Sequence, residues 1–293
     1  MTSDQRTDSP AMPHDEDELF LIEGVLDQLY VEDALDKLMA RIDPQRHSKP
    51  TSKRVVVATA APFAQATGII ERTLVPSDPG EERDYFACRM EGQVVFGSFA
   101  GAGKLKQGHR VKVAVSRVGE ALRAHGILDP QQGYVWVHHP SGSAADDKAG
   151  RLFALWTFCF AYPCMAAMFW LIGPEGPDAL KLQLLPLISC VVLCASMALT
   201  GSWGMLAPSE APTRIFGLLG FVDPQRVDLL QYRIWWVEMC KFRERIAVNK
   251  KALRSGRMKP IAEPELLRES SDRTRHVHDY RQAIADGKVV VIR

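Results

Sequence analysis

The sequence predicts an α+β membrane protein with a small antiparallel β-barrel, a two-helix transmembrane hairpin and a helical C-terminal region. Three observations lead to this fold class: two long uncharged apolar runs, a series of short β-rich segments before them, and charged amphipathic segments at both ends of the chain. The expected parts are an acidic helical segment at 1–45, a β-rich domain at 54–140, the hairpin at 152–206 and a basic helical region at 207–293 that ends in a short strand.

The hairpin consists of residues 152–172 and 184–206, neither of which contains a charged residue. A helix needs about 20 residues to cross a hydrocarbon core of roughly 30 Å, so each run is long enough to span a membrane. The short connection makes the two helices antiparallel. Five positions are candidates for packing within the hairpin: Pro163, Cys190, Cys194, Ala198 and Ser202.

The basic residues near the hairpin lie mainly before its first span and after its second. This distribution predicts a multi-pass protein of the bacterial inner membrane with both termini in the cytoplasm. Neither span contains an ionisable residue, which disfavours a transporter or ion pump. A pore lined by Ser and Thr residues of the second span stays open, although a packing face is the favoured interpretation.

Residues 54–140 contain short segments rich in β-branched and aromatic residues, separated by turns that contain Gly and Pro. The predicted strands are RVVVATA, ATGIIERTLV, DYFACRM, QVVFGSF, HRVKVAVSR and GYVWVHH. These segments predict an OB-like or SH3-like antiparallel barrel. Many OB folds bind nucleic acid, but here acidic residues offset the basic ones, so no nucleic-acid partner is expected.

The two ends of the chain have opposite charges. Residues 15–42 alternate acids with apolar residues at mostly helical spacing, which predicts one amphipathic helix or a broken pair. A basic helix is expected from about residue 226 to 253, and a further helix at 264–285 is followed by a strand, KVVVIR, on the edge of the barrel. The candidates for contact with a membrane interface or lipid are Trp235, Trp236, Lys241, Arg243, Arg245, Lys250 and Lys251. Docking of this helix on the barrel or on the acidic segment is an equal alternative.

No familiar catalytic or cofactor motif occurs. GSFAGAGK at 97–104 lacks the Gly spacing and the final Ser or Thr of a phosphate-binding loop, and a turn between strands explains its glycines. His138, His139, His276 and His278 are interpreted as surface histidines, and the six cysteines form no zinc or disulfide framework. We therefore expect a non-enzymatic protein with no metal and no cofactor.

Three segments, LKQGHRVKVAVSR (105–117), GYVWVHHPSG (133–142) and RIFGLLGFVDPQRVDLL (214–230), together with the two apolar runs, resemble a family of bacterial two-span membrane proteins. The members of this family are described as candidate effectors of the type VI secretion system. The chain differs from the family at DPQQGYVWVHHPSG, where a stretch similar to RPSDGYLWMP is typical. The resemblance implies association with a contractile secretion machine and specifies no catalytic residue.

Two hypotheses of function follow. In the first, the chain is a non-enzymatic effector or accessory component of type VI secretion that acts through its membrane hairpin and its cytoplasmic binding domain. In the second, it is a resident membrane-anchored immunity or scaffold protein that binds a cytoplasmic protein. The expected partners are the lipid bilayer and one or more proteins, with a homo-oligomer left open.

Overall fold

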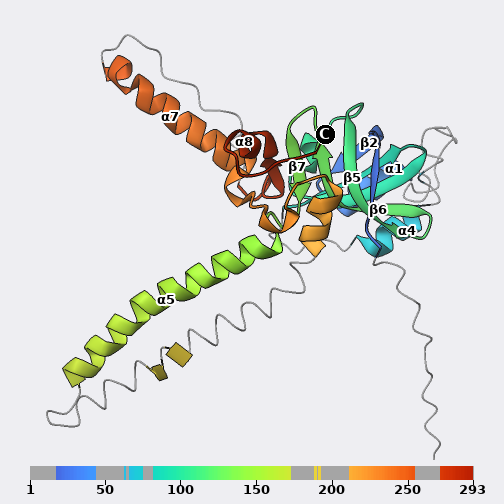
Figure 1. Ribbon diagram of the computed structural model, residues 1–293. Helices are drawn as coiled ribbons and strands as arrows, with labels where there is room; N and C mark the ends of the chain where they lie inside the picture. The colour runs from blue at the N-terminus through green and yellow to red at the C-terminus, as the bar shows by residue number, and fades with distance from the viewer. Residues whose placement is uncertain are drawn as a thin grey trace, which may run out of the picture. The chain divides into compact units, whose positions relative to one another are not determined.

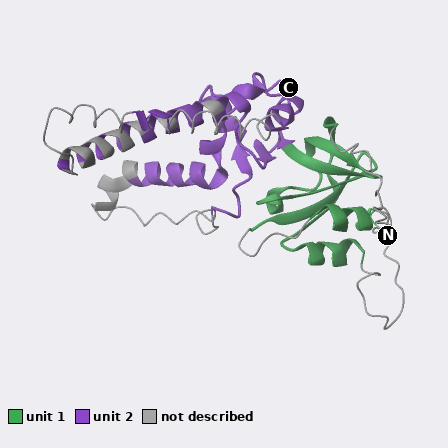
Figure 2. Ribbon diagram, turned by 90° about the horizontal axis from the view of Figure 1, so that it is seen from below, with its two compact units in different colours: residues 1–127 green, residues 128–293 purple. Residues whose placement is uncertain are grey.

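The computed structural model describes residues 18–43, 63, 66–74, 82–172, 188–189, 191–192, 211–254 and 271–292. The chain divides into two compact units, Met1–Ile127 and Leu128–Arg293 (Figure 2). Each unit is described by itself, with the labels of Figure 1.

The first unit is built on strands β1 (Phe20–Val25), β2 (Asp27–Glu32), β3 (Asp84–Met90), β4 (Gln93–Phe99), β5 (Arg110–Val118) and β6 (Ala121–Asp129). Their order in the sheet is β1-β5-β6-β4-β3-β2. The β1–β5, β2–β3 and β3–β4 pairs are antiparallel, whereas β4 and β6 are parallel. Only Leu26 separates β1 from β2, and its amide donates a hydrogen bond of 2.9 Å to the carbonyl of His109.

Strands β3 and β4 alternate side chains between two buried layers, so both faces of this pair require apolar residues. On one face Phe86 stacks on Phe99 with ring centroids 5.9 Å apart. Gly97 pairs with Phe86 across the strands, and a Cβ at Gly97 would lie 2.9 Å from the Phe86 ring. Glycine at this position therefore makes room for the aromatic pair.

On the other face, the helices α1 (Leu35–Ile42) and α4 (Thr67–Thr73) contribute to a buried apolar cluster. Leu38 and Ile42 of α1 and Ile70 of α4 have no exposed surface, and they pack in this cluster with Tyr85 and Phe96 of the sheet. The 3-10 helix η2 (Ala102–Lys104) follows β4, and the Gly103 amide in it donates to the Asp84 carboxylate at 3.0 Å. The predicted turn at GSFAGAGK is thus confirmed.

The second unit contains strands β7 (Tyr134–Val137) and β8 (Val277–Asp279), which pair in antiparallel fashion. Its helices are α5 (Ser143–Ile172), α7 (Ile234–Arg254) and α8 (Tyr280–Ala285), with short 3-10 helices η3 (Pro224–Arg226) and η4 (Leu230–Tyr232). Trp136 of β7 has no exposed surface and is the largest fully buried side chain among the described residues.

Several local predictions are confirmed and others are wrong. DYFACRM, QVVFGSF, HRVKVAVSR and GYVWVHH each contain a strand. Residues 20–32 form two strands where a helix was predicted, because pairing with β5 and β3 determines their conformation. Conversely, ATGIIERTLV contains helix α4, and β6 was not predicted at all. RVVVATA lies outside the described residues.

The C-terminal predictions also changed. Residues 277–285 form β8 and α8 instead of part of one longer helix. The terminal segment pairs with the second unit, because Phe221 bridges to Val291 and the Val222 amide donates to the carbonyl of Val290 at 2.7 Å. Its predicted place on the edge of the barrel was therefore wrong.

The predicted fold class was wrong in its sheet. In the first unit the strand pairings give a mixed sheet with a parallel β4–β6 pair, and the strand order has β1 and β2 as separate ends. The prediction was a closed antiparallel barrel. Such a barrel has no parallel pair of strands and no strands at the ends of the order, so the observed sheet differs from it in both respects. The turn chemistry identified most of the strands, but sequence alone did not define their order.

The predicted transmembrane hairpin was also wrong. Within the described ranges of the chain, no helix combines the length and the apolar character needed to cross a membrane. Helix α5 covers the first predicted span but begins earlier, and Asp146, Lys148 and Arg151 lie in its first turns. The second span, 184–206, lies outside the described residues except for 188–189 and 191–192. The predicted multi-pass location in the inner membrane depended on these spans, so that prediction was wrong as well.

Candidate interaction surface

The start of α5 is fixed to a distant part of the chain. The Gly142 amide donates to the carbonyl of Val227 at 2.8 Å, and the Leu229 amide donates to the carbonyl of Pro140 at 2.9 Å. One residue further, the Ser143 amide donates to the Thr213 hydroxyl at 3.1 Å. We call these contacts the α5 base. They join the start of α5 to residues that follow it by 70 positions or more in the sequence.

Gly142 allows these backbones to approach closely. A Cβ on this residue would lie 2.2 Å from the carbonyl oxygen of Pro224 and 2.7 Å from that of Gln225. No side chain fits there without movement of the backbone. The segments GYVWVHHPSG and RIFGLLGFVDPQRVDLL, which are far apart in sequence, are therefore joined directly by the α5 base.

From this base, α5 extends over 30 residues, about 45 Å at 1.5 Å per residue (Figure 1). Large apolar side chains along it are more than half exposed: Leu152 (55%), Phe153 (67%), Leu155 (59%), Trp156 (57%), Phe160 (66%) and Leu171 (77%). Such a concentration of exposed apolar surface in one element is typical of an interaction site.

The sequence of α5 from residue 152 to 172 contains no charged residue on any side of the helix. We call the exposed apolar residues described in this run the α5 face; its members are Leu152, Phe153, Leu155, Trp156, Cys159, Phe160, Pro163, Cys164, Ala167 and Leu171. Trp156 and Phe160 stack on it with centroids 5.7 Å apart. The described side chains of the α5 face are all apolar.

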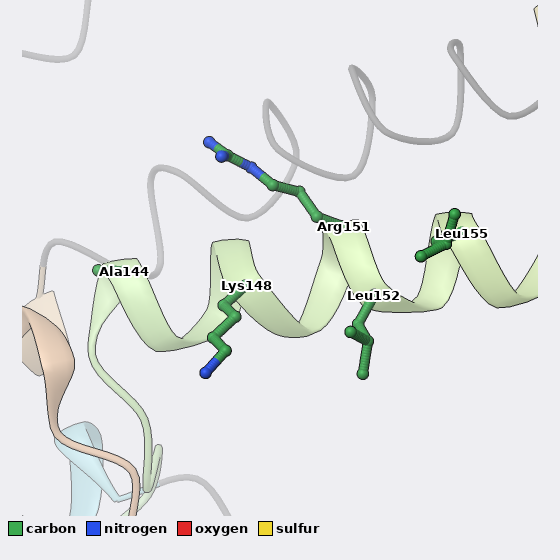
Figure 3. A pocket seen from close by; sticks show the side chains of 5 residues that line it. All are labelled: Ala144, Lys148, Arg151, Leu152 and Leu155. Carbon is green, nitrogen blue, oxygen red and sulfur yellow. The ribbon is translucent and has the colours of Figure 1, made fainter.

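A shallow hollow of about 400 Å³ lies beside the first turns of α5 and is lined by Ala144, Lys148, Arg151, Leu152 and Leu155. Figure 3 shows that Lys148 and Arg151 point away from the helix on different sides. All five of the described lining residues come from this one helix. The first turns of α5 thus contain Lys148 and Arg151 together with the acidic Asp146, whereas residues 152–172 are uncharged.

The predicted interface residues of α7 differ in how exposed they are and in whether they form ion pairs. Trp235 is half-buried and Trp236 is exposed, with ring centroids 6.2 Å apart. Lys241 and Arg245 both lie near Glu238, at 3.6 and 3.9 Å, so part of their charge is balanced within the helix. Arg243 is exposed, while the side chains of Lys250 and Lys251 lie outside the described residues.

Of the five predicted hairpin-packing residues, the structure describes one. Pro163 lies within α5, and its side chain is exposed on the α5 face. Cys190, Cys194, Ala198 and Ser202 lie outside the described residues.

Two of the four histidines interpreted as surface residues are buried. His139 is exposed, but His276 is 6% exposed and His278 has no exposed surface. The His138 and His276 rings are perpendicular, with centroids 4.6 Å apart. In the part of the chain that the structure describes, no group of three or more His, Cys, Asp or Glu side chains is arranged to hold a metal. The position of His278 in β8 explains its burial, because β8 pairs with β7.

Sequence reasoning missed one close pair of potentially reactive side chains, Ser116 and His125. Their Oγ and Nε2 atoms are 2.8 Å apart, on the neighbouring strands β5 and β6. Burial, together with the charge of Arg123, lowers the pKa of His125 to about 4, so its ring is neutral at pH 7. Ser116 is only 2% exposed, so we interpret the pair as a structural contact. The short turn at Gly119 and Glu120 is the sequence signal from which the pairing of these two strands could have been predicted.

Comparison with protein-family models, with curated proteins and with solved structures gave no match to this chain.

Proposed function

We propose that this protein is a non-enzymatic effector or accessory component of a type VI secretion system that binds a protein partner through the α5 face. The single observation that carries the binding role is the exposure of six large apolar side chains along one helix. Covering such side chains is favourable by about 25 cal/mol per Å² of apolar surface removed from water. A protein that presents them together gains stability from a partner that covers them.

The association with secretion rests on the resemblance of residues 105–117, 133–142 and 214–230 to the effector family. Two of these segments meet at the α5 base, through the Gly142–Val227 and Leu229–Pro140 hydrogen bonds. They therefore hold in place the helix to which we assign the binding role. This arrangement supports the proposal that the two segments have one structural role, which is to hold α5 in position.

The proposal is tested in the bacterium that encodes this chain, by contact-dependent killing of a sensitive strain. We expect deletion of the gene to reduce killing, and the wild-type gene to restore it. Phe153→Asp places a charge on the α5 face and is expected not to restore killing, because a desolvated carboxylate opposes binding. Val290→Asp is the matched control, since Val290 is also exposed but lies far from α5 in sequence.

Two results would contradict the proposal. Killing that is unchanged by the deletion would remove the link to secretion, and full rescue by Phe153→Asp would remove the role of the α5 face. A deletion that instead makes the bacterium sensitive to a toxin of its own siblings would identify the chain as an immunity protein.

A further inference from the structure

We draw no further inference here: the strongest candidate, the exposed apolar side chains of α5 in the second unit, carries nothing beyond the proposed function, because nothing in the described part of the chain shows what covers them.

Discussion

At the scale of the residue, His278 is the most unusual side chain of the second unit. It has no exposed surface, and neither ring nitrogen has a hydrogen-bond partner of normal geometry. Burial lowers its pKa to about 3 and the charge of Arg233 acts in the same direction, while the backbone groups of His276 and Val135 act in the opposite one. The imidazole ring is therefore neutral in the folded unit. Its buried nitrogens lower the stability of the folded state, because they lack hydrogen bonds of normal geometry.

This burial predicts a loss of stability in acid. Between its ordinary pKa of 6.5 and about 3, the unfolded chain binds a proton at His278 and the folded chain does not. The free energy of unfolding should therefore fall by up to ~1.4 kcal/mol for each unit that the pH drops through this window. Urea unfolding followed by tryptophan fluorescence reports on the second unit, because every Trp lies after residue 128.

His278→Leu is expected to flatten this pH dependence and to leave stability at pH 7 unchanged or slightly raised, since an unpaired buried polar group is removed. His139→Gln, which replaces an exposed ring, should keep the wild-type pH dependence. An unchanged slope in His278→Leu would show that other groups cause the acid sensitivity.

At the scale of the element, the α5 base determines where the long helix begins. At the start of the helix, the Ser143 amide donates a hydrogen bond to the Thr213 hydroxyl. Because Gly142 lies against the Pro224 and Gln225 carbonyls, the position of α5 depends on a glycine that touches backbone only.

Gly142→Ala should destabilise the second unit by about 2–3 kcal/mol, because the added methyl group overlaps the Pro224 carbonyl and the backbones must separate. The measurement is urea unfolding at pH 7 with tryptophan fluorescence. Gly150→Ala is the control: no atom lies within 4 Å of the added Cβ, and alanine in a helix is neutral or stabilising by up to ~1 kcal/mol. Equal stability of the two variants would show that the α5 base is not closely packed.

At the scale of the whole molecule, the chain divides into two units with separate probes of folding. Cys88 of β3 is completely buried in the first unit, and burial raises the pKa of its thiol to about 12, so it reacts only when this unit opens. The tryptophans report on the second unit. The two signals allow each unit to be followed in the same sample.

Phe96→Ala is expected to destabilise the first unit by about 3–5 kcal/mol, because Phe96 is fully buried in the cluster with α1 and α4. Maleimide labelling of Cys88 should become much faster, whereas the urea midpoint from tryptophan fluorescence should stay constant. Leu21→Ala, which shortens a partly exposed side chain of β1, should have little effect on either signal. A tryptophan midpoint that falls together with Cys88 protection would show that the units unfold as one.

Local patterns predicted most strands of the β-rich region, the turn at GSFAGAGK and an apolar helix at 152–172, because alternation, Gly turns and uncharged length are local properties. Three features became evident only from the fold: residues 20–32 are strands, β4 and β6 are parallel, and His278 is buried. Each of these depends on a partner that is distant in sequence: β5 and β3, β6, and β7. The same reason explains the α5 base, where Gly142 and Val227 meet across more than eighty residues of chain, a contact that no local pattern of either segment specifies.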